Sequence, residues 1–374
     1  EAREDYTPEL APTQLFRDLT DSLGVQFVHE EPEFIDFNGQ KLLPHKLSQY
    51  PPAVATADVN GDGLADLFVG GSRLHKGRFL MQQANGTFAL ADLLPGEEGA
   101  AKESEDMGVL LFDADGDGDN DLYIASGSNE YPAGHASYQD RLYLNDGKGQ
   151  FSAATQALPQ ALISTSCVRA SDYDRDGDLD LFVGGRVEPG HYPRPVSSFI
   201  LRNDTAGGKV QFTNVTQQVA PELQTGGLIC DALWTDYNAD GFVDLLVAGE
   251  WAPLRMYQNK NGTLVPDEAL NSYLESYKGF WNSLIGGDFD NDGDTDYVVG
   301  NLGLNTIMRV SDTTPLTMLA GDFNQDGIQD LIIATEDDGQ IQVLLGNGDG
   351  SFDSNQIPSV WLPQEIRETY LGYF

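Results

Sequence analysis

The sequence predicts an all-β fold, a β-propeller of six to seven four-stranded blades, with seven expected in the full protein. Three observations predict this fold. An acidic nine-residue motif occurs six times, beginning at residues 58, 113, 172, 236, 288 and 322. A short apolar run directly follows each copy, and a second hairpin signal follows most of these runs. Each repeat therefore offers about four antiparallel strands, which is the content of one propeller blade.

Each acidic motif lies between two strand-like segments. The segment before it is short and small or apolar, as at 53–57, 108–112, 232–235 and 283–287. The run after it is rich in Val, Ile, Phe, Leu and Tyr, and occurs at 67–69, 122–124, 181–183, 245–247, 297–299 and 331–333. Such short runs are typical of strands. The motif therefore predicts a hairpin loop between the first two strands of a blade.

The second hairpin of a repeat is predicted by Asn-Gly and Asp-Gly turns, which are strong hairpin signals. These turns occur at 85–86, 145–149, 261–262 and 346–350, and 200–202 with 210–212 forms a further pair. The fifth repeat has only 34 residues before the next motif and lacks a clear second hairpin. Short strands are also expected at 16–20 and 25–28, where the first resembles an outer strand that completes the last blade.

The predicted organisation is one large domain with short flanking segments. Residues 1–14 are polar and form a tail or linker, and 15–358 form a single propeller domain. Residues 359–374 form a C-terminal segment that we interpret as the start of further structure. Because this segment does not complete a seventh repeat, we expect the chain to be an excerpt or a processed form.

The acidic motif has the chemistry of a cation site. The copy that begins at Asp172 has carboxylates at positions 1, 3, 5 and 9 and Gly177 at position 6. Carboxylates so close together repel one another, and a hard divalent cation with oxygen ligands relieves that repulsion. Glycine permits the sharp turn around the ion, and position 7 can add a main-chain carbonyl.

The predicted ligands are positions 1, 3, 5, 7 and 9 of each loop. They are Asp58, Asn60, Asp62, Leu64 and Asp66; Asp113, Asp115, Asp117, Asp119 and Asp121; Asp172, Asp174, Asp176, Asp178 and Asp180; Asp236, Asn238, Asp240, Phe242 and Asp244; Asp288, Asp290, Asp292, Asp294 and Asp296; and Asp322, Asn324, Asp326, Ile328 and Asp330.

Calcium fits these loops better than other metals, and up to six Ca²⁺ ions are expected. An EF-hand needs a glutamate at position 12 and flanking helices, whereas position 12 here is always Val or Ile within a strand-like run. Magnesium demands a tighter octahedron and retains waters. Zinc and copper prefer nitrogen and sulfur ligands, which the loops lack.

The composition excludes some classes of binding partner and indicates where the protein is located. The formal charge of −38 argues against nucleic acid and anionic membrane surfaces. Two cysteines, Cys167 and Cys230, exclude a disulfide framework, and we interpret them as free thiols. No apolar run is long enough to span a bilayer. Weak multi-carboxylate sites suit millimolar extracellular calcium, so we expect an exported protein at the outer cell surface, outside the cell or in the periplasm.

These motifs resemble a known repeat family. Asp-x-Asp/Asn-x-Asp-Gly-x-x-Asp followed by Leu-Phe-Val-Gly resembles FG-GAP/VCBS repeats, the calcium-binding blades of integrin α-subunit propellers. Segments 42–48, 140–147, 172–186 and 281–305 are similar to bacterial exported VCBS-repeat proteins of the ASPIC/UnbV type, which are related to cartilage acidic proteins. The resemblance covers residues 15–350 and implies a propeller with calcium at the loop positions above. After Asp330 no ASPIC-like domain is visible, so the resemblance implies no specific activity.

The expected function is a calcium-stabilised binding or assembly module that recognises a protein or glycan at the cell surface, as part of a larger complex. The long connections 126–140 and 186–198 carry the candidate contact residues Tyr131, His135, Tyr138, His191 and Tyr192. Ordinary loop packing is the alternative interpretation for each of them.

Two alternative functions stay open. One is a propeller-based enzyme acting on polysaccharide or another extracellular substrate, with His29, Glu30, Glu31 and His45 as candidate metal or acid–base groups. No recognised catalytic motif accompanies these residues. The other is a purely structural spacer subunit.

Overall fold

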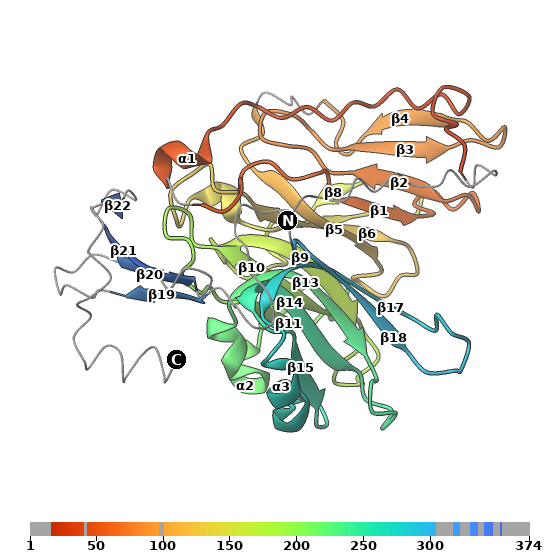
Figure 1. Cartoon of the computed structure of the whole chain (residues 1–374). Coiled ribbons are helices and arrows are strands. Elements are labelled where there is room, and N and C mark those ends of the chain that lie inside the picture. The colour runs from red at the N-terminus through yellow and green to blue at the C-terminus, as the bar shows by residue number, and fades with distance from the viewer. Residues whose placement is uncertain are drawn as a thin grey trace.

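The chain folds into a series of antiparallel sheets that follow one another in chain order (Figure 1). The computed structural model describes residues 16–40, 43–96 and 101–303, and the strands at 317–321, 330–335, 340–346 and 352–353. The predicted tail at 1–14, the segment at 359–374 and most of the sixth acidic loop lie outside these residues. The described part is all-β with four-stranded antiparallel sheets, which confirms the predicted blade architecture of a β-propeller.

The strands of each sheet are consecutive in the chain. The first sheet contains β1 (Val54–Ala57), β2 (Asp66–Val69), β3 (Arg78–Gln82) and β4 (Phe88–Asp92); the second contains β5 (Glu105–Phe112), β6 (Asp121–Gly127), β7 (Arg141–Leu144) and β8 (Ser152–Ala153). The third contains β9 (Ser164–Ser171), β10 (Asp180–Val187), β11 (Phe199–Asn203) and β12 (Phe212–Asn214); the fourth contains β13 (Leu228–Thr235), β14 (Asp244–Ala252), β15 (Arg255–Asn259) and β16 (Leu264–Pro266). The last described sheet, from the sixth repeat, contains β19 (Thr317–Gly321), β20 (Asp330–Thr335), β21 (Gln340–Gly346) and β22 (Phe352–Asp353).

The described part of the fifth repeat, which ends at residue 303, contains one pair of strands, β17 (Gly279–Gly287) and β18 (Asp296–Asn301). The residues that would form its second hairpin lie outside the described ones, so the expected lack of that hairpin stays a prediction. β17 also pairs with the end of β14, where Glu250 lies opposite Phe280, so the fourth sheet gains two strands. Short helices occupy the connections: α1 (Asp36–Gly39), η2 (Ala136–Tyr138), α2 (Thr216–Val219), η3 (Pro221–Thr225) and α3 (Glu268–Leu274).

The second strand of a middle sheet is buried on both faces, which explains its continuous apolar run. In β6, Leu122 and Ile124 face the first sheet, whereas Tyr123 between them faces the third. In β10 the alternation repeats, because Leu181 packs toward the second sheet and Phe182 toward the fourth. Successive residues of a strand point to opposite faces, so each second strand serves two hydrophobic layers. Burying one such side chain contributes about 1.5–3 kcal/mol.

Neighbouring sheets meet along the first strand of the later sheet. β5 contacts β1, β9 contacts both β5 and β6, and β13 contacts both β9 and β10. The approach is tight at Gly108 in β5, where an added Cβ would lie 2.6 Å from the carbonyl oxygen of Ser166 in β9. Only glycine fits at such a backbone-to-backbone contact.

The two N-terminal strands predicted at 16–20 and 25–28 are wrong. Neither segment is a strand, and Phe16 and Val28 are 87% and 77% exposed. The segment meets the first sheet through one main-chain hydrogen bond, from the amide of Phe88 to the carbonyl of Leu23 (2.9 Å). Val25 and Phe27 are half-buried, and Phe27 lines a cavity with Arg78 and Leu90 of the first sheet, but neither segment pairs as a strand. Strand propensity alone therefore does not form a strand.

Two further predictions concern the cysteines and membrane-spanning segments. Cys167 and Cys230 are free thiols, as expected. Among the described helices, none has the length and apolar character that a membrane span requires.

The N-terminal connection is held to the third and fourth sheets by a buried ion cluster. Glu250 of β14 accepts hydrogen bonds from Arg186 Nη2 (2.5 Å) and from the His45 ring (2.6 Å) through the same carboxylate oxygen, and its other oxygen accepts from Tyr192 (2.8 Å). Burial alone would raise the pKa of Glu250, but Arg186 and His45 lower it to about 2. Burial opposes the charge on His45, yet the hydrogen bond to Glu250 leaves the pKa of His45 raised.

The opposed shifts predict a pH window for this contact. Because the folded pKa of His45 lies above its unfolded value of 6.5, its stabilisation is complete below that pH and is lost as the pH rises through the folded pKa. Glu250 contributes above its unfolded value of 4.5 and loses its contribution as the pH falls toward about 2. We expect His45→Gln to lower the free energy of unfolding by about 1.5–3 kcal/mol between these two unfolded pKa values, and by clearly less at about pH 9.

Urea unfolding of both proteins at several pH values measures this difference. His191→Gln is the matched control, because His191 is exposed and contacts only its own connection. An equal loss for His45→Gln at both ends of the range would contradict the assigned charge of His45.

Candidate metal centres

Each acidic loop joins the first and second strands of its sheet. Position 1 follows the last residue of the first strand, and position 9 is the first residue of the second strand, as in Asp113 after β5 and Asp121 at the start of β6. The hairpin thus brings the two ends of a nine-residue motif together. The prediction that the motif connects two strands is confirmed for all six loops.

The loop backbone is shaped by its own side chains. Position 1 accepts main-chain hydrogen bonds from across the loop, as Asp58 does from Gly61 and Gly63 (2.8 Å each). The position 5 carboxylate accepts from the amide of position 7 in each of the first five loops. The side-chain carboxylates thus accept hydrogen bonds from loop amides that have no partner strand to bond with.

Two positions of the loop adopt left-handed backbone, where the sequence indicated only one. Gly177 at position 6 has φ of +103°, as expected, but Arg175 at position 4 also has φ of +65°. Ala239 and Asn291 occupy the same position 4 with φ of +55° and +63°. Residues other than glycine are generally disfavoured in left-handed backbone, so the hydrogen bonds of the loop must stabilise this conformation.

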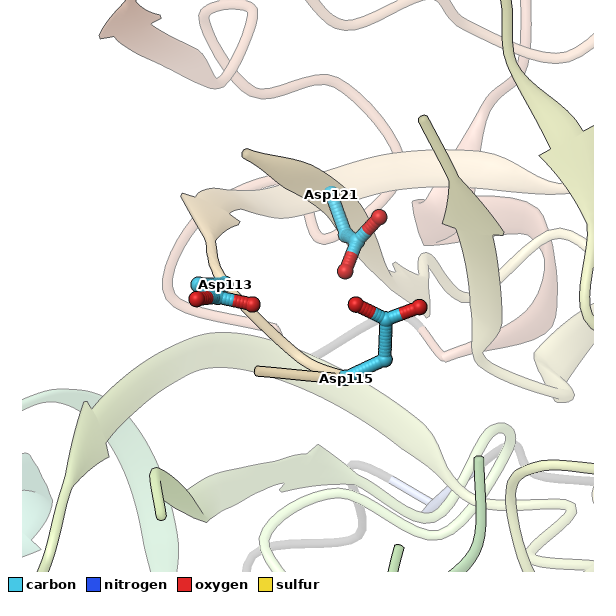
Figure 2. A group of neighbouring side chains, drawn as sticks. All are labelled: Asp113, Asp115 and Asp121. Atoms are coloured by element: carbon cyan, nitrogen blue, oxygen red, sulfur yellow. The ribbon is translucent and has the colours of Figure 1, made fainter. Parts of the chain in front are cut away.

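Carboxylates from positions 1, 3 and 9 converge. Figure 2 shows the side chains of Asp113, Asp115 and Asp121 turned toward one another around a common space. In each converging loop, one oxygen from each of the three carboxylates lies within 4.8 Å of the other two. The same grouping occurs in the third loop, at Asp172, Asp174 and Asp180, and in the fifth, at Asp288, Asp290 and Asp296.

The converging charges are strongly unfavourable without a cation. Burial, reinforced by the neighbouring loop carboxylates, raises the pKa of Asp180 to about 8 against the main-chain hydrogen bond from Asn203. Burial likewise raises the pKa of Asp121 to about 7. In the first loop the hydrogen bond from Gly63 lowers the pKa of Asp58, whereas burial raises that of Asp66. Position 9 is therefore where burial makes an ionised carboxylate most costly, and where a nearby positive charge would stabilise the ionised form most.

Several loop oxygens have no hydrogen-bond partner although they are shielded from solvent. They are Oδ2 of Asp180 and Asp244 at position 9, Oδ1 of Asp174 at position 3, and Oδ1 of Asp119 and Asp178 at position 7. Buried carboxylate oxygens are normally paired. Three of these oxygens belong to the third loop, and unpaired carboxylate oxygens suit a hard cation such as Ca²⁺.

The predicted ligands differ in how the structure places them. Positions 1, 3 and 9 meet in the second, third and fifth loops, whereas the first and fourth loops have Asn60 and Asn238 at position 3. The position 5 and position 7 ligand roles stay predictions, since the position 5 carboxylates bond the loop backbone. Asp322, Asn324, Asp326 and Ile328 lie outside the described residues, and Asp330 begins β20.

Sequence reasoning missed the role of three asparagines at the ends of the third strands: Asn203 and Asn259 are the last residues of β11 and β15, and Asn145 directly follows β7. The main-chain amide of each donates to Oδ1 of the position 9 aspartate in its own sheet, at 2.7–2.8 Å. Their common place at the end of the third strand is visible in the sequence. The distance to position 9 varies from 15 to 24 residues, which hides the pattern unless the strands are aligned.

The histidine candidates do not form one centre. His29 contacts Glu31 (2.5 Å) and lines a cavity of about 450 Å³ with Glu30 and His75. His45 instead contacts Glu250 in the buried ion cluster. Within the described residues, the groups of three acidic or metal-binding side chains that could hold an ion contain no histidine.

The aromatic candidates separate into packing and surface residues. Tyr138 and Tyr192 are buried, with hydroxyls bonded to Tyr131 and Glu250, so loop packing explains them. Tyr131 and His135 stack with ring centroids 4.2 Å apart, and both are partly exposed.

Several solved structures are similar to this chain. A lectin from Agrocybe aegerita that recognises non-reducing terminal N-acetylglucosamine aligns with a TM-score of 0.42 and 17% identity, over 81% of this chain and 79% of its own. A protein from Bifidobacterium bifidum s17, provisionally assigned as an exo-β-1,3-galactanase, aligns with a TM-score of 0.34 and 11% identity, over 79% and 91%. The Photorhabdus luminescens Tc holotoxin pore aligns with a TM-score of 0.29 and 18% identity, over 79% of this chain and 11% of that one. No curated protein sequence matches the chain.

The family comparison agrees with the loop positions. The FG-GAP-like repeat matches at 58–124, 113–183, 236–299 and 322–369, which together are more than half of the chain. Each match begins at position 1 of an acidic loop, and the first three end in the second strand of the following repeat. The finer resemblance to ASPIC/UnbV-type and integrin α-subunit repeats stays a prediction. Because these matches cover more than half of the chain and coincide with the strand pairs that carry the acidic loops, the chain belongs to the family of FG-GAP-like repeat proteins.

Proposed function

We propose that this protein is a calcium-stabilised binding or assembly module that is exported and recognises a protein or glycan at the cell surface. The observation that carries the proposal is the set of converging loop carboxylates with unpaired buried oxygens. Such an arrangement supports a structural ion that leaves the rest of the surface free for recognition. The expected single domain spans residues 15–358.

Calcium is proposed because of the donor set and its charge. Asp172, Asp174 and Asp180 offer three carboxylates and no nitrogen or sulfur. Calcium accepts six to eight oxygen ligands in flexible geometry, which suits a loop that also offers main-chain carbonyls. Extracellular calcium concentrations would fill sites of modest affinity, which supports an exported location.

The partner surface is proposed at the end of the sheets opposite the metal loops. Each second strand begins at position 9 of its loop and runs away from it, so the connection to the third strand lies at the far end. The connections of the second and third sheets meet there, where the amide of Gly190 donates to Asn129 Oδ1 (3.1 Å). The stacked Tyr131 and His135 and the exposed His191 belong to these connections, and flat aromatic groups with polar edges suit sugars and protein partners.

An enzyme acting on polysaccharide is the alternative function, and one observation favours it. Beside the cavity that His29 and His75 line, burial and the charge of Glu31 together raise the pKa of Glu105 to about 8. Perturbed carboxyls near a cavity are candidate acids. Polysaccharide hydrolysis that is lost in Glu105→Gln would favour this function over binding alone.

Removing a position 3 carboxylate should remove one ion. We expect Asp174→Ala to lower the number of bound Ca²⁺ ions by one, because Asp174 is one of three carboxylates that converge in the third loop. Isothermal titration calorimetry of the full chain measures the stoichiometry. Asp204→Ala is the control, since Asp204 is a partly exposed carboxylate outside the loop that pairs with Arg202. Unchanged stoichiometry in a folded Asp174→Ala protein would count against the ligand assignment.

Changing the proposed contact surface should weaken partner binding without affecting the fold. We expect Tyr131→Ala to reduce glycan-array or pull-down binding by about tenfold or more, because truncating an interface aromatic removes at least about 1–2 kcal/mol. Tyr273→Ala is the matched control, because Tyr273 is an exposed tyrosine on α3 in another connection. Equal binding by both variants would place the partner surface elsewhere.

A further inference from the structure

The third-strand asparagines join neighbouring metal loops. In the second, third and fourth sheets, the side-chain amide of this asparagine donates to the position 2 carbonyl of the preceding loop and the position 8 carbonyl of its own loop. The bonds run from Asn145 to Val59 (2.8 Å) and Asn120 (3.2 Å), from Asn203 to Ala114 (3.0 Å) and Leu179 (3.4 Å), and from Asn259 to Tyr173 (2.7 Å) and Val243 (3.0 Å).

Each asparagine is also held firmly in place. Asn145, Asn203 and Asn259 are 8%, 4% and 2% exposed. Their side-chain oxygens accept amide hydrogen bonds from the following turn, as Asn259 does from Gly262 (2.8 Å). Buried, fully bonded amides are rigid, and removing one donor leaves carbonyls unpaired.

The bonds form an uninterrupted path across three loops. Asn203 bonds Asp180 through its main chain and Ala114 through its side chain. Ala114 in turn donates to Asp121 Oδ2 (2.9 Å), whose other oxygen accepts from Asn145 (2.8 Å). Asn145 then reaches Val59 in the first loop. The path connects the position 9 carboxylates of consecutive sheets.

The place of position 2 makes this path sensitive to a bound ion. Ala114 lies between Asp113 and Asp115, two of the three residues whose carboxylates converge in the second loop. An ion held by these two side chains would fix the backbone between them. The carbonyl of Ala114 would then be a fixed acceptor for Asn203, whose main-chain amide bonds Asp180 in the next loop.

We propose that Asn145, Asn203 and Asn259 couple neighbouring metal sites, so that a cation bound in one loop raises the affinity of the next loop for a cation. This inference rests on the proposed calcium binding. The third and fourth loops, which Asn259 joins, also touch directly: the guanidinium of Arg175 in the third loop lies 3.8 Å from the ring centre of Phe242 in the fourth. Within the described residues, the fifth pair ends at β18 and no asparagine hydrogen bond joins the fifth loop to the fourth.

The third loop offers its own spectroscopic signal. Tyr173 at position 2 stacks on Trp234 with ring centroids 6.1 Å apart. Terbium, which takes the same oxygen ligands as calcium, should luminesce when these rings are excited. Loss of this signal in Asp174→Ala assigns it to the third loop.

The test measures terbium and competing calcium titrations of the full chain at this site. Asp115→Ala, which disables the second loop, should weaken third-loop affinity by about fivefold or more. In protein that already carries Asn203→Ala, Asp115→Ala should not lower third-loop affinity any further, because the hydrogen-bond path between the two loops is already broken. The two single variants and the double variant together form the double-mutant cycle that measures this coupling. Asp290→Ala in the fifth loop is the control and should leave third-loop affinity unchanged.

Each outcome decides the inference. Third-loop affinity that is unchanged by Asp115→Ala would overturn the coupling, and an equal loss in the Asn203→Ala background would overturn the role of the asparagine. If Asn203→Ala does not fold by circular dichroism, Asn203→Asp keeps the size and removes the donor. Absence of any terbium or calcium binding to the native chain would instead overturn the proposed function.

Discussion

Mutual repulsion among loop carboxylates is the constraint on which the rest of this structure depends. The first and second strands of each sheet can pair to their ends only if the position 1 and position 9 side chains lie side by side. Position 9 is buried at Asp66, Asp121, Asp180 and Asp244, where water cannot screen the charge. Main-chain amides stabilise these carboxylates in part, but several carboxylate oxygens keep no hydrogen-bond partner. A bound cation would stabilise those oxygens, so cation binding and pairing of the two strands favour each other.

Hydrophobic contacts between neighbouring sheets hold the repeats together. Because Leu181 and Phe182 face different neighbours, the third sheet cannot bury its core alone. Each sheet depends on the sheets before and after it, which is the behaviour of a repeat protein. The asparagine hydrogen bonds run along the same axis at the metal end, so polar and apolar contacts both link neighbouring repeats.

Sequence periodicity predicted the parts that depend on neighbours in the chain. The hairpin loops, the second strands and the turn glycines follow from short patterns, and the structure confirms them. The strands expected at 16–20 failed because a strand needs a partner edge that no local pattern reveals. His45 and Glu250 are 205 residues apart, so their contact was invisible for the same reason. The convergence of positions 1, 3 and 9 could be predicted, whereas the role of Asn203 depends on a loop 89 residues earlier.

The metal-loop account can be tested most directly by differential scanning calorimetry of the full chain, first stripped of metal with a chelator and then returned to calcium. If cations neutralise the converging carboxylates, the stripped protein should melt at a clearly lower temperature, and calcium should restore the loss in a concentration-dependent way. Magnesium at the same concentration should restore less, because it fits the flexible oxygen-rich loops poorly. An unchanged melting temperature after verified metal removal would contradict the account.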